Sequence, residues 1–320
     1  MQNPASSNTC THTFADRHIH GIAGVDFATS STAAIRDALA FLRSRRTTAV
    51  TASIPTMTGV DTEAALHTVE PLVHQTLLEG VHLEGPFIAP RFAGAHPRDA
   101  ILTPHSPAGQ DYLRMVHDHQ SANSSIRMMT VAPELPGFQD LVEQLVAMGI
   151  APALGHTNVD YQGMRTSIDD LYRLTGEPVV ITHGYNAMRG FHHRDPGPLL
   201  AIMEAARDDQ VVVELIADGQ HVALEVIRWW FATYPEVIRL VSDASAATLP
   251  PGVRPLTAGT PRLGHLDLAY GTSAGPRLAD HTTLASGARD LLSMHDGLVD
   301  AGFEHDHVCV AMRAEAHEDL

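Results

Sequence analysis

The chain has 320 residues, 44% hydrophobic and 18% charged, as expected of a soluble globular protein, and no apolar run approaches the roughly 18 residues of a membrane helix. The formal net charge of −16 argues against a nucleic-acid partner, which needs a dense basic surface, but not against a small phosphorylated ligand. Lysine is absent and all 21 residues counted as lysine or arginine are arginine, which excludes Schiff-base, P-loop and carboxylated-lysine chemistry.

Apolar, β-branched segments alternate with segments of helical period, the pattern of a parallel sheet with crossover helices. Strands are predicted near Phe14–His20, Thr47–Ile54, Gly80–Glu84, Ile126–Ala132, Ala151–His156, Val179–His183, Val211–Ala217 and Ile238–Asp243. Helices are predicted at Ala33–Arg46, Thr62–Leu78, Asp111–Gln120, Phe138–Met148, Tyr161–Leu174, Leu199–Arg207, Ala223–Tyr234 and Thr283–Val299. Such a series predicts an α/β fold, a (β/α)8 TIM barrel. The alternative is an open doubly wound sheet, but the first unit lacks the Gly-rich dinucleotide-binding motif that would support it.

We expect one catalytic barrel domain over residues 14–300, between a polar N-terminal tail at 1–13 and a polar C-terminal tail at 301–320. Long loops rich in Pro and Gly follow the third, sixth and eighth strands, at Gly85–Pro107, Gly184–Pro198 and Ala244–Thr282. Barrel enzymes build their active sites from such loops. The N-terminus lacks the features of a secretory signal, and two cysteines are too few for a disulfide framework, so the cytoplasm is the expected compartment.

The first predicted strand carries two histidines on one face. His18 and His20 are two residues apart, so both imidazoles point the same way and can serve one cation. The chain has 21 histidines, which makes a histidine pair weak evidence by itself. A structural or surface pair is the alternative.

Four further candidate ligands close predicted strands. Glu84 ends the third strand, His156 the fifth, His183 the sixth and Asp243 the eighth. A carboxylate at the end of an apolar strand is costly to bury unless it is paired or bound to a metal. His82 shares a face with Glu84 and is interpreted as a supporting or core residue. Because all these positions fall at the C-terminal ends of strands, the sequence predicts a metal site there.

Six motifs stand in order along the barrel: His82-Leu-Glu-Gly-Pro-Phe-Ile, Gly94-Ala-His-Pro, Leu154-Gly-His-Thr-Asn, Thr182-His-Gly-Tyr-Asn-Ala-Met, Asp218-Gly-Gln-His-Val and Leu240-Val-Ser-Asp-Ala. In this order and spacing the sequence resembles the N-acetylglucosamine-6-phosphate deacetylases, a family of the amidohydrolase superfamily. The resemblance runs from about Asp16 to about Leu292. It implies a metal-dependent hydrolase that removes the N-acetyl group of an amino-sugar phosphate, giving the free amine and acetate.

The resemblance also implies ligand roles. The principal metal would be held by Glu84, His156 and His183. A second would be held by His18, His20 and Asp243, with Glu84 bridging. Zinc is the expected ion, with iron(II) or another divalent ion as the alternative, and one or two ions per chain are open.

Substrate contacts follow by the same resemblance. Asp243 would be the acid/base, and His221 would help to stabilise the oxyanion. The phosphosugar would be held by Asn186, Ala187, Arg194 and His221, and His96 would contact a sugar hydroxyl. Because the family's phosphate-binding arginine comes from a neighbouring subunit, a homodimer is expected.

Three departures from the family pattern leave the substrate open. The small β-sandwich that flanks the barrel in the family is not expected here, because the predicted tails are short. Gly184 stands where leucine is usual, and the segment Gly275–Thr282 replaces a Ser-Gly-Ser-like loop. A related hydrolase acting on another N-acyl substrate is therefore the first alternative, and a non-catalytic binding barrel is the second.

Overall fold

The computed structural model describes residues 12–272, 274–278 and 280–313, and within them eight parallel strands form a barrel. In order of pairing, these are β1 (Phe14–Ile19), β4 (Thr47–Pro55), β5 (Leu78–Glu84), β6 (Ile126–Val131), β7 (Ala151–Leu154), β8 (Val179–Ile181), β9 (Val211–Leu215) and β10 (Ile238–Leu240). The segment after β10 meets β1, because the Asp243 N–H donates to the His18 carbonyl at 2.8 Å and the His20 N–H to the Ala244 carbonyl at 2.7 Å. The predicted (β/α)8 barrel is confirmed.

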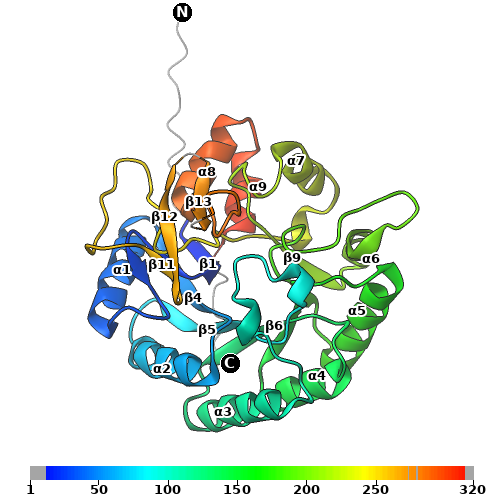
Figure 1. The fold of residues 1–320 in the computed structure, drawn as a ribbon. Helices are drawn as coiled ribbons and strands as arrows, with labels where there is room; N and C mark the ends of the chain where they lie inside the picture. Colours follow the sequence, from blue (N-terminus) through cyan, green and yellow to red (C-terminus); the bar gives the residue numbers. More distant parts are fainter. Residues whose placement is uncertain (1–11, 273, 279, 314–320) are drawn as a thin grey trace, which may run out of the picture.

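Helices form a ring around these strands (Figure 1). They are α1 (Thr32–Ser44), α2 (Gly59–Val69), α3 (Pro107–Asn123), α4 (Phe138–Ala147), α5 (Tyr161–Thr175), α6 (Gly197–Arg207), α7 (Leu224–Thr233), α8 (Leu291–Asp300) and α9 (His305–Ala311). Several begin at a side-chain cap, as where the Ser31 hydroxyl accepts from the Ala34 N–H and the Asp160 carboxylate from the Gly163 N–H. Among the described residues, no helix is long and apolar enough to cross a membrane.

The loop at Ala244–Thr282 is partly ordered into a small antiparallel sheet. It consists of β11 (Arg262–Leu263), β12 (Leu266–Thr272) and β13 (Gly275–Leu278). A second short hairpin, β2 (Gly21–Ile22) with β3 (Val25–Asp26), follows β1. Short 3-10 turns lie at Glu70–Leu72, Pro90–Phe92, Arg98–Ala100 and Pro235–Val237.

The C-terminal part of the chain differs from the prediction in two places. The helix expected at Thr283–Val299 begins only at Leu291, where Asp290 caps it by accepting from the Ser293 N–H. The prediction of a polar tail over 301–320 was wrong for its first part, because α9 forms there and buries Val308 and Cys309. Helix α9 has only seven residues and its first three are His-Asp-His, so its apolar face was too short to recognise. The remainder of both predicted tails, 1–11 and 314–320, lies outside the described residues.

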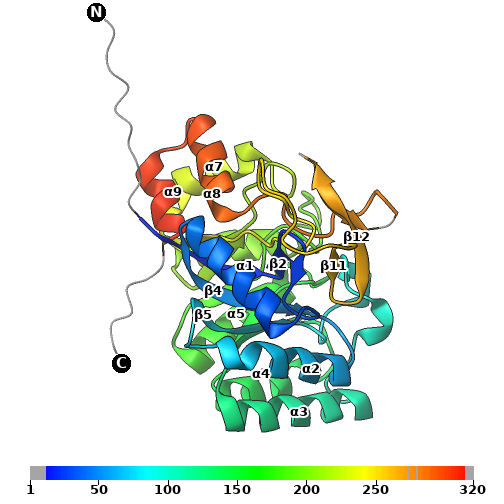
Figure 2. The same cartoon turned by 90° about the vertical axis from the view of Figure 1, so that its left-hand side faces the viewer.

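The small sheet and α9 lie on opposite sides of the molecule (Figure 2).

Candidate metal centre

The six predicted ligands converge at the C-terminal ends of the strands, and all are buried. The backbone is left-handed directly after three of the strands, with φ of 47° at His156, 29° at His183 and 47° at Asp243. Such values are uncommon for residues other than glycine and cost about 1–3 kcal/mol each unless the surroundings hold them. Positive φ also occurs at eight other non-glycine residues among those described, so it is the coincidence with three predicted ligands that is typical of a functional site.

Glu84 lies between two histidines. Its Oε1 is 3.0 Å from His156 Nε2 and 2.8 Å from His183 Nε2, and these two nitrogens are 3.0 Å apart. The His156 Nδ1 faces the Phe92 carbonyl at 2.7 Å. A carbonyl only accepts, so we assign the proton to Nδ1, which leaves a lone pair on Nε2. Electron-rich atoms this close repel one another unless a cation lies between them, and this donor set suits a divalent metal.

A second set is formed by the histidine pair of β1 and Asp243. The Asp243 Oδ1 is 3.3 Å from His20 Nε2 and 3.5 Å from His18 Nε2. His20 Nδ1 faces the Ser53 carbonyl at 3.0 Å, and His18 Nδ1 faces a Glu214 carboxylate oxygen at 3.4 Å. When the rings are neutral, both Nε2 atoms are therefore left with lone pairs directed at carboxylates.

The His18 Nε2 atom is buried and has no hydrogen-bond partner among the described residues. An orphaned imidazole nitrogen beside carboxylates fits a missing cation. Glu84 connects the two sets, because its Oε2 lies 3.1 Å from His20 Nε2. The residues present therefore fit one cation in each set, with Glu84 between them.

The ionisation equilibria of the site favour positive charge near the carboxylates. Burial lowers the pKa of His20, but its hydrogen bonds to Asp243 and Glu84 outweigh burial and raise that pKa to about 9. Burial likewise lowers the pKa of His18, and the charges of Glu84 and Asp243 raise it well above its usual value. For Glu84, burial raises the pKa, yet the charges of His96 and His18 hold it well below its usual range. Protons and metal ions thus compete for the same place.

His96 lies in the same cluster but differs from the ligands in its tautomer. Its Nδ1 accepts from the Thr56 N–H at 3.2 Å, so the ring proton is on Nε2, which donates to Glu84 Oε2 at 3.2 Å. Although His96 is close enough to be a ligand, this arrangement makes it a residue that orients Glu84. Its predicted contact with a sugar hydroxyl would require one of these two bonds to break.

A pocket of about 180 Å³ opens over the ligands. Among the predicted substrate contacts, Asn186, Ala187, His96 and His221 line it. Arg194 does not line it and is exposed on the loop before α6. The structure therefore brings together every predicted site residue except Arg194, while their roles stay predictions.

Two supporting carboxylates were missed in the sequence. Glu214 lies in β9, where an acidic residue inside the apolar run Val-Val-Val-Glu-Leu was a usable signal. Asp218 accepts from His221 Nδ1 at 2.9 Å and from the Ala288 N–H at 2.9 Å. The His221 Nε2 is thereby free to face the pocket as an acceptor when the ring is neutral. His82 has the supporting place expected of it, between the Ser53 and Thr130 hydroxyls.

No protein-family model matches the sequence. The N-acetylglucosamine-6-phosphate deacetylase of Bos taurus is 32% identical over 243 residues, 73% of this chain and 57% of that protein. The solved structure of N-acetyl-D-glucosamine-6-phosphate deacetylase from Mycobacterium smegmatis, in complex with N-acetyl-D-glucosamine 6-phosphate, is 30% identical with a TM-score of 0.79, covering 95% of this chain and 75% of that one. The chain belongs to the N-acetylglucosamine-6-phosphate deacetylase family.

The match spans a little over half of the length of the curated N-acetylglucosamine-6-phosphate deacetylases. The N-acetylgalactosamine-6-phosphate deacetylase of Escherichia coli O157:H7 is similar too, at 31% identity over 250 residues, 75% of this chain and 61% of that protein. The amidohydrolase fold of the family implies a divalent metal, for which the His18 and Glu84 clusters are the candidate sites.

Proposed function

We propose that this chain hydrolyses the N-acetyl group of an amino-sugar 6-phosphate, with N-acetylglucosamine 6-phosphate as the first candidate substrate. The observation that carries the proposal is the pair of donor sets around Glu84, with Asp243 among the residues that line the pocket over them. We propose Zn²⁺ for the Glu84, His156 and His183 set, since imidazole and carboxylate ligands suit it. When bound, such an ion supplies Lewis acidity, which acidifies a water molecule and polarises the amide carbonyl.

Asp243 is the group of this chain that moves the proton. Burial raises its pKa, but the His18 charge and the hydrogen bond from His20 lower it below its usual value, so Asp243 is ionised at neutral pH. An ionised Asp243 accepts the proton of the attacking water at Oδ1 or Oδ2 and then protonates the departing amine nitrogen. The amine leaves as a neutral molecule and acetate is the second product.

His221 lines the same pocket as Asp243 and is a candidate donor to the carbonyl oxygen. Burial lowers the pKa of His221, and its hydrogen bond to Asp218 raises that pKa above the usual value overall. A protonated His221 has its Nε2–H free to stabilise the developing oxyanion, because Nδ1 is already held by Asp218.

The phosphate group has no arginine partner among the described pocket-lining residues. We propose that Arg194, from its exposed loop, or an arginine of a second copy in a homodimer supplies it. Since no arginine lines the described pocket, the alternative function is hydrolysis of an unphosphorylated N-acyl substrate by the same residues.

The test is amine release from three compounds by metal-loaded protein. They are N-acetylglucosamine 6-phosphate, N-acetylgalactosamine 6-phosphate and unphosphorylated N-acetylglucosamine, each also assayed with Asp243→Asn. Turnover of a phosphate ester that depends on Asp243 supports the proposal, and the ratio of the two esters assigns the sugar. Metal-loaded protein that turns over neither ester would contradict the proposal, and light scattering would decide on the dimer.

A further inference from the structure

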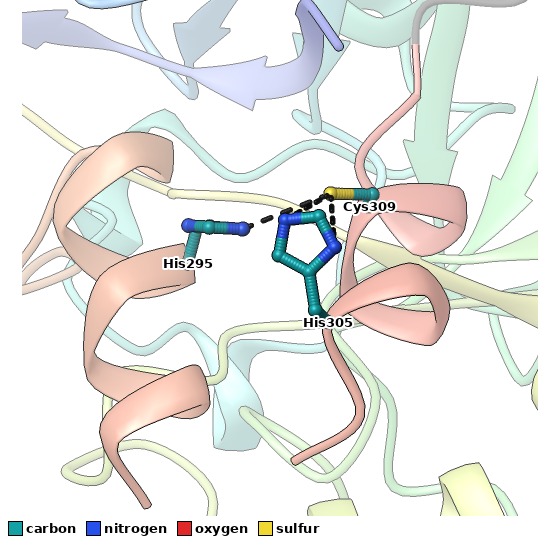
Figure 3. A group of neighbouring side chains, drawn as sticks. All are labelled: His295, His305 and Cys309. Atoms are coloured by element: carbon teal, nitrogen blue, oxygen red, sulfur yellow. Dashed lines mark hydrogen bonds between the residues drawn. The ribbon is translucent and has the colours of Figure 1, made fainter. Parts of the chain in front are cut away.

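A separate group of side chains that could bind a metal lies at the other end of the barrel, between α8 and α9 (Figure 3). His295 comes from α8, and His305 and Cys309 come from α9, four residues apart and so on one helix face. The His295 ring is 5.6 Å from the ring of Phe14, the first residue of β1. The deacetylase site lies at the last residues of β1, so the two groups are separated by the length of the barrel.

The two distances from the cysteine sulfur to Nε2 of each histidine are close to those of a tetrahedral metal site. The Cys309 Sγ is 3.7 Å from His295 Nε2 and 3.7 Å from His305 Nε2. A Zn–S bond of about 2.3 Å and a Zn–N bond of about 2.05 Å at the tetrahedral angle place sulfur and nitrogen about 3.6 Å apart. The three ligand atoms lie within 4.8 Å of one another, close enough to share one ion.

His295 faces the sulfur with Nε2, whereas the sulfur lies beside both nitrogens of His305, 3.7 Å from Nε2 and 4.0 Å from Nδ1 (Figure 3). His295 Nδ1 lies 2.9 Å from an Asp296 carboxylate oxygen, and His305 Nδ1 lies 3.0 Å from an Asp306 carboxylate oxygen. An ionised carboxylate only accepts, so each Nδ1 carries the proton and each Nε2 presents a lone pair. A carboxylate behind each histidine is the usual support for metal-ligating imidazoles, which it orients and makes more basic.

The three side chains of this group differ in exposure. Cys309 and His295 are 3% and 6% exposed, whereas the His305 side chain is 20% exposed. A thiol beside two imidazoles is readily converted to a thiolate by a bound cation.

We propose that His295, His305 and Cys309 bind Zn²⁺ in a structural site that fastens α9 to α8. Thiolate and imidazole together select zinc over the oxygen-preferring ions. The site is independent of the deacetylase activity, since it shares no residue with the barrel mouth. Its function is to hold the short C-terminal helix, which has too few residues to be stable alone.

Cobalt(II) is the probe that separates the two sites. The barrel mouth offers only nitrogen and oxygen ligands, so a cobalt–thiolate charge-transfer band can arise only from a cysteine. The experiment uses the Cys10→Ser variant of the full chain, in which Cys309 is the only cysteine. We expect the band in Cys10→Ser and its loss in Cys10→Ser/Cys309→Ser, together with the loss of one zinc equivalent by elemental analysis.

A second variant guards against misfolding of the cysteine variant. His305→Gln replaces a partly exposed ligand, and we expect it to weaken cobalt binding at this site and to shift the band, while N-acetyl hydrolysis is unchanged. A chelator of moderate strength is expected to lower the Tm of Cys10→Ser more than that of the double variant. The proposal is overturned by the absence of a band at saturating cobalt, by a band that survives Cys309→Ser, or by equal zinc content in the two proteins.

Discussion

His20 Nε2 lies 3.3 Å from Asp243 Oδ1, although one residue follows the first strand of the barrel and the other follows the last. This contact lies within the second donor set, to which both residues belong, and the Asp243 backbone N–H also closes the barrel by donating to the His18 carbonyl. The chemistry of Asp243 and the closure of the fold therefore depend on one segment.

Asp243→Asn is expected to reduce kcat by on the order of 100-fold or more, because an amide cannot accept the water proton. The main metal should remain, since its ligands are Glu84, His156 and His183. Steady-state assays with elemental analysis on the same sample test both statements. Near-normal turnover would remove Asp243 from the proton-transfer role.

His156→Ala is expected to lose the principal metal, because one of its three ligands (Glu84, His156 and His183) disappears. His117→Ala is the matched control, since His117 is an exposed histidine of α3 far from the site. Metal content after exhaustive dialysis is the measurement. Equal content in the two variants would show that His156 is not a ligand.

Glu214→Gln is expected to weaken binding of the second ion by roughly 10- to 100-fold, because the charge that supports His18 Nδ1 is lost. The first ion should bind as before. A competitive titration with a chromophoric chelator resolves the two equivalents. A variant that binds both ions with unchanged affinity would speak against a supporting role for Glu214.

Arg194→Ala is expected to raise KM for the phosphorylated substrate more than for its unphosphorylated analogue, with kcat little changed. Arg277→Ala is a useful comparison, because the Arg277 charge already acts on His221. If the loss appears in Arg277→Ala alone, the phosphate is held beside His221 and the prediction for Arg194 is wrong.

Asp218→Asn is expected to lower stability in a pH-dependent way. Burial raises the pKa of Asp218, but the hydrogen bond from His221 and the charge of that residue lower it from 3.8 to about 2. Because the pKa of Asp218 is lower in the folded state than in the unfolded state, its ionised carboxylate stabilises the fold at pH values above the unfolded-state pKa. This stabilisation is about 2 kcal/mol at neutral pH and is lost as the pH falls toward 2. Denaturant unfolding of both proteins should show a difference that shrinks between about pH 5 and pH 3. A constant difference would exclude the ionic contribution.

Much of the fold could be predicted because its determinants are local. Apolar strand segments alternate with segments of helical period, and this pattern indicates which residues face the core. The pattern can be recognised in each segment of the chain without knowledge of distant contacts. The candidate ligands were found for the same reason, since His156, His183 and Asp243 lie two or three residues after recognisable strands. Helix α9 was not predicted, because a helix of seven residues is stabilised by packing against α8 and shows no clear helical period in its sequence.

What the sequence alone determined was the barrel and the set of residues at the mouth. The tertiary structure decided which nitrogen of each imidazole is presented, because the partner that fixes the tautomer comes from another strand or loop. The Phe92 carbonyl sets His156, the Ser53 carbonyl sets His20, and the Thr56 N–H turns His96 from a ligand into a support for Glu84. Backbone groups are the same at every position of a sequence, so only their placement in space distinguishes a metal ligand from its neighbour.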